Sequence, residues 1–339
     1  MPFGRLSTLG VIAAVLIATA CGSAGGSVDR AATLESGNET LVVTTVAPIT
    51  SIASSVIGDR ATIVGLVPEG TNSHTFEPPP SAASALANAD VVFINGLQLE
   101  EPTRDLAVGN MDDSALLVEL GDATITAAEF KFDFSFPEAE GKPNPHLWTD
   151  PLLAKGYAER IMETMRAVDP SGAAQYEANY AEFAAIVDDL DVAIGEAFAT
   201  IAEADRKLVT YHDAYAYFAD TYGWTVIGAI QPADFGEPTP AEVVRLIEQI
   251  RAESVPAVFG SEVFPSPVLE QVAKETGATY IDELRDDDLP GEPGDPEHSW
   301  LGLMRFNFIT MTDALGGDSS AIRNLELRQV GPDLATYPQ

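Results

Sequence analysis

Short apolar runs alternate with helical stretches along the chain from position 41 onward. In the first half, runs at 41–47, 61–67 and 90–95 predict strands, and residues 81–89 predict a helix. The second half repeats the pattern, with strands predicted at 207–211, 225–230, 257–261 and 278–284 and helices at 213–222, 240–253 and 266–275. Such alternation is typical of the α/β class, in which mostly parallel sheets are flanked by helices.

One long amphipathic helix is predicted between the two halves. Its apolar residues recur three or four positions apart and form a single stripe: Tyr176, Tyr180, Phe183, Val187, Leu190, Ile194, Phe198 and Ile201. From Pro170 to Asp205 this helix would span about 50 Å. A coiled-coil arm is one interpretation, but the flanking halves favour a rigid helix packed across two lobes. We therefore expect an N-terminal lobe at 41–169, a linking helix at 170–205 and a C-terminal lobe at 206–339.

Residues 1–20 have the pattern of a bacterial export signal. Arg5 is the only charged side chain before position 21, and the apolar run at 11–20 is too short for a bilayer, which takes about 20 residues. The run ends at Cys21, the only cysteine, in a segment that resembles a lipoprotein lipobox. We expect a signal peptide at 1–20, a lipid anchor on Cys21 and a flexible tether at 21–40. These features predict a location on the extracytoplasmic face of the cell membrane. The alternative is an ordinary secretory signal with an incidental cysteine.

The charge and the rare residue types exclude several functions. The 339 residues include 18 Lys and Arg against 52 Asp and Glu, a formal net charge of −34. Nucleic acid is therefore not an expected partner, because its phosphates require a basic surface. One cysteine and four histidines exclude a disulfide framework and a zinc site built on several thiolates. Any metal must be bound by imidazole and carboxylate groups.

Three of the four histidines lie where loops meet predicted elements. His74 lies in the loop after the strand at 61–67, and His212 directly follows the strand at 207–211. Open parallel sheets bind ligands at these carboxyl ends of their strands. His146 precedes a helix for which Asp150 is the predicted N-cap. A single loop histidine is usually not a ligand, but three in such positions indicate a metal site.

Four segments around these residues carry recognisable motifs. They are Ser-His-Thr-Phe-Glu-Pro around His74, Asn-Pro-His-Leu-Trp-Thr-Asp-Pro around His146, the segment that begins at His212, and Glu-Leu-Arg-Asp-Asp-Asp-Leu at 283–289. Together they resemble the metal-binding solute receptors of ABC importers, the ZnuA/TroA-type or cluster A-I family, over roughly residues 41–315. The resemblance implies two α/β lobes joined by one backbone helix, with a metal ion in the cleft between them. It further implies a receptor, expected to be a monomer, that delivers its ion to an ABC permease.

The resemblance also implies the metal ligands. The first three fall on His74, His146 and His212, and the fourth, a carboxylate after the last strand, falls on Asp287 with Asp286 as the alternative. A solvated loop is the other interpretation of this acidic run. Three extra residues at 296–298 depart from the family pattern and make His298 a candidate accessory ligand. A place near the start of the final helix is the simpler explanation for His298.

Three imidazoles and one carboxylate suit a tetrahedral Zn²⁺, whereas Mn²⁺ prefers more oxygen donors. In the family, the third ligand is often Glu in manganese receptors and His in zinc receptors, so His212 favours zinc. Mn²⁺ or another divalent metal is the alternative cargo. A secreted zinc hydrolase is a competing function, since three histidines and an open water position also form a catalytic site. Because the chain has no His-Glu-x-x-His motif and no evident general base, we expect a receptor and not an enzyme.

Overall fold

The computed structural model describes Met1 and residues 40–263 and 266–339. Apart from Met1, the predicted signal peptide lies outside these residues, as do Cys21 and the predicted tether except for Thr40. The described residues from Thr40 on belong to one compact unit. None of the described helices combines the length and the apolar character that crossing a membrane requires.

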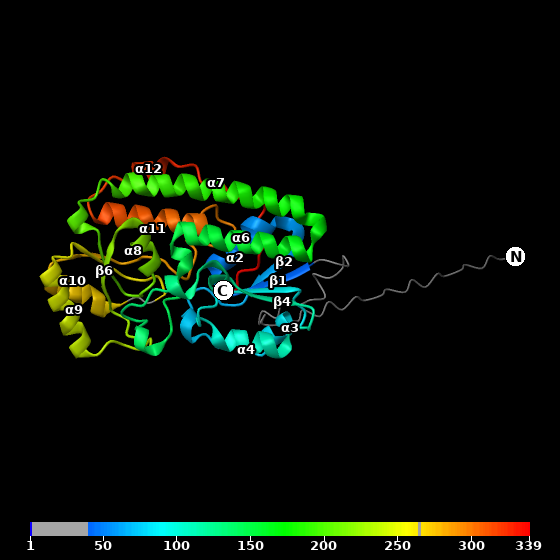
Figure 1. The fold of residues 1–339 in the computed structure, drawn as a ribbon, viewed down its shortest axis with the longest axis horizontal. Helices are drawn as coiled ribbons and strands as arrows, with labels where there is room; N and C mark the ends of the chain where they lie inside the picture. Colours follow the sequence, from blue (N-terminus) through cyan, green and yellow to red (C-terminus); the bar gives the residue numbers. More distant parts are fainter. Residues whose placement is uncertain (2–39, 264–265) are drawn as a thin grey trace. The chain divides into compact units, whose positions relative to one another are not determined.

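The first sheet has four parallel strands in the order β2-β1-β3-β4 (Figure 1). Its strands are β1 (Thr40–Thr44), β2 (Ala61–Gly65), β3 (Val91–Ile94) and β4 (Leu116–Glu119). The helices of this part are α2 (Ala47–Ile57), α3 (Ala82–Leu86), α4 (Glu101–Asn110), α5 (Leu120–Thr124) and α6 (Pro151–Val168). Val42 of β1 lies in a core cluster with residues of α2 and α6, while Val43 lies in another with residues of α3 and α4. Because successive side chains point to opposite faces and both faces are covered, the strands are continuous apolar runs.

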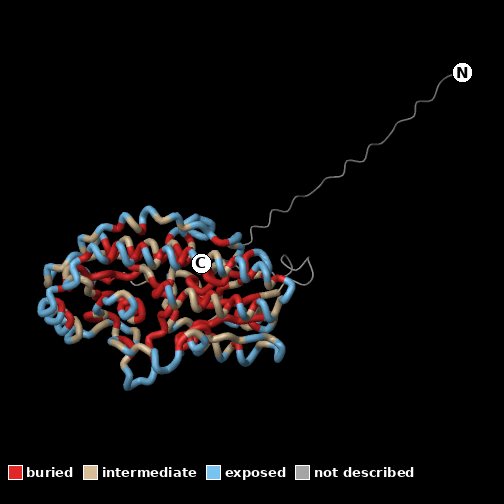
Figure 2. The backbone as a smooth tube through the Cα atoms, turned by 45° about the horizontal axis from the view of Figure 1, so that its top comes forward, coloured by how far each residue is buried: buried red, intermediate tan, exposed pale blue. Residues whose placement is uncertain are grey.

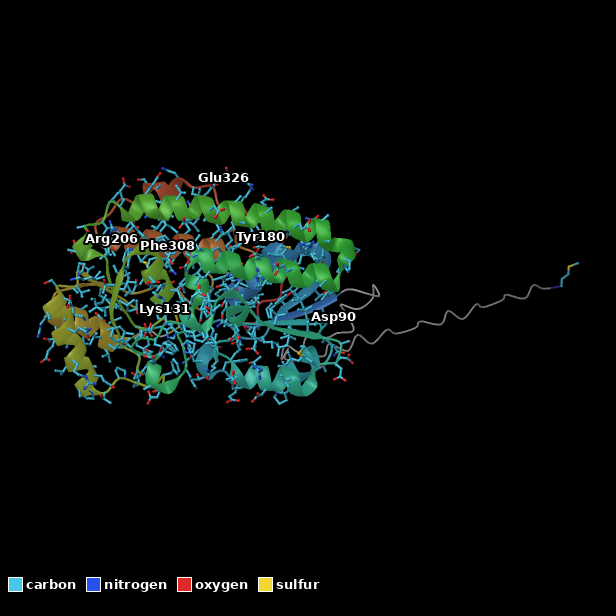
Figure 3. All side chains as sticks on the ribbon, in the orientation of Figure 1. Asp90, Lys131, Tyr180, Arg206, Phe308 and Glu326 are labelled. Carbon is cyan, nitrogen blue, oxygen red and sulfur yellow. The ribbon has the colours of Figure 1, made fainter. Side chains whose placement is uncertain are left out.

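The second sheet repeats this topology, with four parallel strands in the order β6-β5-β7-β8. Its strands are β5 (Lys207–Thr210), β6 (Thr225–Ala229), β7 (Ala257–Phe259) and β8 (Thr279–Ile281). The helices that follow are α8 (Ala216–Tyr222), α9 (Pro240–Glu253), α10 (Pro267–Thr276), α11 (Trp300–Ala314) and α12 (Ser320–Asn324). Val209 of β5 lies in a cluster with residues of α9 and α10. On the other face, Phe308 of α11, labelled in Figure 3, stacks on Phe218 of α8 with 5.3 Å between ring centroids.

The long helix predicted between the halves is α7 (Ala173–Phe198), which is shorter than the predicted 170–205. Its 26 residues span about 39 Å. The flanking segments Pro170–Gly172 and Glu203–Asp205 form separate 3₁₀ turns, and Asp169 caps the first of them by accepting from Ser171 N–H (3.1 Å). α7 packs against α2 and α6 of the first part and against α11 and α12 of the second (Figure 1). It therefore joins two α/β lobes, as expected from the sequence.

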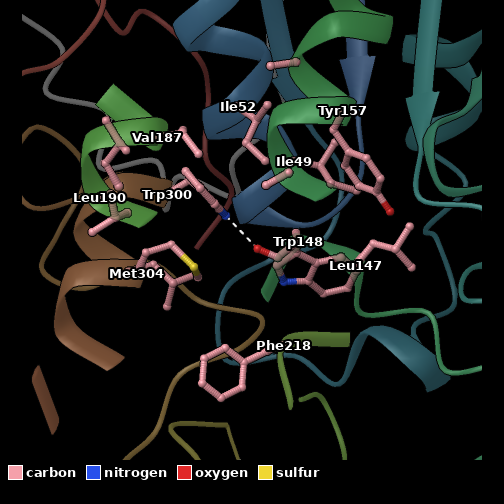
Figure 4. Packing of buried hydrophobic residues seen from close by; sticks show 14 of the residues in the cluster. Ile49, Ile52, Leu147, Trp148, Tyr157, Val187, Leu190, Phe218, Trp300 and Met304 are labelled. Carbon is pink, nitrogen blue, oxygen red and sulfur yellow. Dashed lines mark hydrogen bonds between the residues drawn. The ribbon is translucent and has the colours of Figure 1, made fainter. Parts of the chain in front are cut away.

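A shared hydrophobic core also connects the two lobes. One cluster includes Trp148 before α6, Trp300 of α11, Ile52 of α2 and Phe218 of α8 (Figure 4). Trp300 Nε1–H donates to the carbonyl of Trp148 at 2.8 Å, so the buried indole N–H has a hydrogen-bond acceptor inside this core. Figure 2 shows the buried residues concentrated in the strands and in the inner faces of the helices. Such a continuous core restricts movement of one lobe against the other.

Several predicted boundaries differ from the structure. The strand predicted at 41–47 ends at Thr44, because Pro48 lies in the first turn of α2. The helix predicted at 213–222 begins at Ala216, because the carboxylate of Asp213 accepts a hydrogen bond from Ser135 N–H (2.9 Å) in place of capping a helix. α9 has the predicted limits, and α6 begins at the predicted N-cap Asp150. α2, α4, α5, α12 and β4 were not among the predicted elements.

The last described segment returns to the first sheet. Thr336 forms a parallel bridge with Val64 of β2, and Gly65 N–H donates to the carbonyl of Thr336 at 3.0 Å. This contact lies against the first lobe, although the segment falls in the predicted second lobe. The lobe limits 41–169, 170–205 and 206–339 remain a prediction.

Candidate metal centre

His74, His146 and His212 come from three separate segments. His74 lies in a 3₁₀ turn after β2, where its N–H donates to the side chain of Asn72 (3.0 Å). His212 follows the end of β5, and His146 lies directly before the 3₁₀ turn Leu147–Thr149 that leads into α6. His146 and His212 are buried, and His74 is half-buried. The placement of two of them beyond strand ends is the one predicted from the sequence.

The Nε2 atoms of the three imidazoles converge on one point. The Nε2 distances are 2.9 Å from His146 to His212, 3.1 Å from His74 to His146 and 3.3 Å from His74 to His212. Nitrogens that bind one ion at about 2.0–2.1 Å lie about 3.3 Å apart at the tetrahedral angle. A single metal ion can therefore contact all three atoms without rearrangement of the segments that carry them.

The Nδ1 atoms of His146 and His212 are each held by a side-chain amide. His146 Nδ1 lies 2.8 Å from Asn144 Oδ1, and His212 Nδ1 lies 2.5 Å from Gln231 Oε1. Asn144 Nδ2 donates to the carbonyl of Asp213 at 2.7 Å, which fixes the orientation of this amide. Since an amide oxygen only accepts, Nδ1 of each ring carries a proton, and the neutral form of such a ring has its free lone pair on Nε2.

Burial keeps two of the imidazoles neutral. Loss of hydration lowers the pKa of His74 and of His146 well below the ordinary value for histidine. The charge that His212 would carry when protonated acts in the same direction on both groups. Neutral imidazole is the form that binds metal ions, so these two side chains are ready to act as ligands at neutral pH.

The carboxyl groups of Asp286 and Asp287 lie beside the histidines. Asp286 Oδ2 lies 3.3 Å from His212 Nε2, and ligand atoms of His146, Asp286 and Asp287 all lie within 4.8 Å of one another. Burial raises the pKa of Asp286 well above its usual value and raises that of Asp287, the latter against the opposing effect of His212. The structure thus brings both of the predicted alternatives for the fourth ligand to the histidines. Asp288 points elsewhere, because its carboxylate accepts from Gly70 N–H (2.7 Å).

Glu262 is a buried residue of the candidate site that the sequence analysis missed. Its Oε1 accepts hydrogen bonds from three consecutive N–H groups, those of Asp286 (2.8 Å), Asp287 (3.1 Å) and Asp288 (3.1 Å). Burial raises the pKa of Glu262 to about 7. The residue follows the strand predicted at 257–261, so the strand-end rule that selected His74 and His212 could also have selected it. Gln231, just beyond β6, was also missed, although it too follows the end of a strand.

His298 lies apart from the three convergent histidines. Among the described residues, the groups of three or more side chains that could hold a metal do not include it. Its Nε2 lies 3.9 Å from Glu69 Oε1, and its ring meets the edge of Tyr337 with 4.9 Å between centroids. It directly precedes Ser299, the N-cap of α11, so the simpler prediction for its position agrees with the structure. α11 is not the final helix, because α12 follows it.

Comparisons with known proteins identify the family. Residues 42–314 match the family model described as ZnuA, zinc-uptake complex component A, periplasmic. The chain is 28% identical to the manganese-binding lipoprotein MntA of Halalkalibacterium halodurans over 305 residues, which cover 90% of this chain and 96% of that protein. It is 29% identical to the iron-binding protein YfeA of Yersinia pestis, over 93% of this chain and 97% of YfeA. The fold matches that of the periplasmic zinc-binding protein TroA of Treponema pallidum, with a TM-score of 0.74, 23% identity and coverage of 82% of this chain and 99% of TroA. The chain therefore belongs to the ZnuA family, whose members are extracytoplasmic receptors of divalent metals for ABC importers and not enzymes.

Proposed function

We propose that this receptor captures Zn²⁺ with His74, His146, His212 and one carboxylate, and delivers it to a cognate ABC permease. The observation that carries the proposal is the convergence of three Nε2 atoms within 2.9–3.3 Å of one another. Three imidazoles with one carboxylate match the donor set and the coordination number of zinc. The carboxylate comes from Asp287, with Asp286 as the alternative.

Mn²⁺ is the second candidate cargo. Both Asp286 and Asp287 are buried beside the imidazoles, and together they offer more oxygen donors than a tetrahedral zinc site uses. Manganese prefers such donors, and the relative MntA is named as a manganese-binding lipoprotein. Zinc remains our first choice because nitrogen supplies three of the donors.

Metal analysis of the purified protein tests the site and the cargo together. The protein is dialysed against equimolar Zn²⁺ and Mn²⁺ without chelator, beside a His146→Ala, His212→Ala double variant. We expect about one zinc per wild-type chain and a loss of stoichiometric metal in the double variant. A His298→Ala variant is the matched control and should retain wild-type zinc. A wild-type protein that holds manganese in place of zinc refutes the zinc proposal, and a double variant that still holds one ion refutes the site.

The fourth ligand is tested by single substitutions. Asp287→Asn should weaken zinc binding more than Asp286→Asn, because the sequence motif aligns Asp287 with the carboxylate ligand of the family. Titration of each variant against a competing chelator measures the two losses. A larger loss for Asp286→Asn would make Asp286 the ligand.

We further propose that Cys21 carries a lipid that anchors the receptor as a monomer on the extracytoplasmic face of the cell membrane. The support is the single cysteine at the end of an apolar run at 11–20, together with the name lipoprotein of the relative MntA. The Cys21→Ser variant, expressed from the full chain, should move from the membrane fraction to the soluble fraction. Light scattering of that variant should give the mass of one chain. Unchanged membrane association would contradict the anchor.

A further inference from the structure

Two phenylalanines cover the imidazole of His74. The ring of Phe235 stacks on it with 4.3 Å between centroids and 12° between planes. Phe136 contacts the same imidazole at 5.5 Å and lies 5.9 Å from Phe235. Phe235 belongs to the segment after β6 of the second lobe, whereas His74 follows β2 of the first lobe. The stacked pair therefore crosses from one lobe to the other.

The backbone at Phe235 is held in an unfavourable conformation. Its φ is +56°, in the left-handed region that bulky residues rarely adopt. A tight turn holds it there, since Phe235 N–H donates to the carbonyl of Pro232 (2.9 Å) and Gly236 N–H donates to Asp234 Oδ1 (3.1 Å). Strained residues of this kind cluster at ligand clamps and at segments that move.

The covered imidazole is also the side of the site nearest to solvent. His146 and His212 are 0% and 2% exposed, and Asp286 and Asp287 are 1% and 4% exposed, whereas His74 is only half-buried. A pocket of about 80 Å³ lies against His74, and Phe136 and Phe235 form part of its lining together with Lys142 and Gln98. Phe235 thus lies both on the wall of this pocket and on the face of His74, the least buried of the three imidazoles.

We propose that Phe235 is a gate that sets the rate at which the divalent ion enters and leaves the site. In this role, the ring leaves the His74 face to open the path and returns to stack on the imidazole once the ion is bound. The turn around it supplies the movable element, while α7 and the shared core hold the lobes in place. Phe235 is thus a positioning residue for exchange and not a ligand. The inference rests on the metal capture proposed above.

Exchange kinetics test the gate. Stopped-flow mixing of the loaded full-length protein with an excess of chromogenic chelator gives the dissociation rate, and mixing of the metal-free protein with Zn²⁺ gives the association rate. We expect Phe235→Ala to raise both rates at least five-fold and to change Kd less than two-fold, because removal of a gate lowers the barrier to exchange in both directions. The matched control is Phe134→Ala, which removes an exposed ring from the segment that carries Phe136 and should leave both rates unchanged.

A second variant keeps the test decisive. Phe235→Leu preserves apolar bulk but removes the aromatic stack, so its two exchange rates should lie between those of wild type and Phe235→Ala. If the alanine variant folds poorly, the leucine variant alone should still exchange the ion faster than wild type. Unchanged rates in Phe235→Leu and Phe235→Ala overturn the gate. A faster dissociation alone, with Kd weakened in proportion, also overturns it, because Phe235 would then merely support His74. A wild-type protein that binds no metal refutes the proposed function instead.

Discussion

Glu262 offers the sharpest test of how the acidic segment is held at the metal centre. The informative substitution is Glu262→Gln, which keeps an oxygen acceptor and nearly the same shape but removes the negative charge. In the structure, one carboxylate oxygen accepts from three N–H groups, at 2.8, 3.1 and 3.1 Å. These contacts orient the backbone that carries both candidate carboxylate ligands.

The expected loss follows from the difference between a charged and a neutral acceptor. A hydrogen bond to a charged group contributes about 1.5–3 kcal/mol, and one between neutral groups about 0.5–1.5 kcal/mol. Because the three bonds share one oxygen, we count the difference once, which gives about 1–1.5 kcal/mol. Each 1.4 kcal/mol corresponds to about ten-fold in affinity, so zinc binding should weaken by about ten-fold. This lies at the lower end of the 10–100-fold effect usual for residues that orient metal ligands.

The assay is a chelator competition at pH 8, where Glu262, with a pKa of about 7, is mostly ionised. Glu292→Gln is the matched control, because it removes the same charge from an exposed position in a neighbouring loop. A Glu262→Gln variant that binds zinc within two-fold of wild type would refute the reasoning. An equal loss in Glu292→Gln would show that overall charge, and not the three hydrogen bonds, controls affinity.

Three further predictions concern stability and orientation. Burial raises the pKa of Glu100 from 4.5 to about 7, so the folded chain keeps a proton that the unfolded chain has lost in this range. The resulting stabilisation of the folded state, about 3 kcal/mol, is complete below pH 4.5 and is lost as the pH rises through 7. In urea titrations, Glu100→Gln should flatten this decrease in the free energy of unfolding with pH. Gln231→Leu should weaken zinc binding by about ten-fold in a calorimetric titration, because His212 Nδ1 loses its acceptor. Leu190→Ala in the buried face of α7 should reduce the free energy of unfolding by about 2–5 kcal/mol and leave the metal content unchanged. Val192→Ala, at an exposed position of the same helix, should change the free energy of unfolding by less than about 0.5 kcal/mol.

Local signals were sufficient for part of the fold. α9 begins where Thr239 and Glu242 form a capping box, and both residues are readable in the sequence. His74 and His212 were found because the ends of β2 and β5 are marked by the change from apolar to polar residues. These features depend on neighbours within a few positions, so the sequence alone defines them.

Other features depend on contacts between distant residues. α2 contains several β-branched residues and does not have the polar stripe of a surface helix, because it is buried between the first sheet and α7. β4 carries the exposed Leu116 and pairs only with β3 in the described sheet. Glu262 acquires its role only when the chain brings the segment at 286–288 beside it, 24 or more positions away. Sequence periodicity contains no information about such pairings.

Most of the candidate ligands and the residues that orient them lie in segments beyond strand ends, and His146 and Asn144 lie in the loop before α6. The sheets and α7 supply much of the stability of the fold from outside these loops. Substitutions that change the preferred ion can therefore accumulate in a few loop positions without weakening the framework. Evolution of a new cargo then requires few steps, and the same loop positions are the ones to vary when redesigning the protein for another ion.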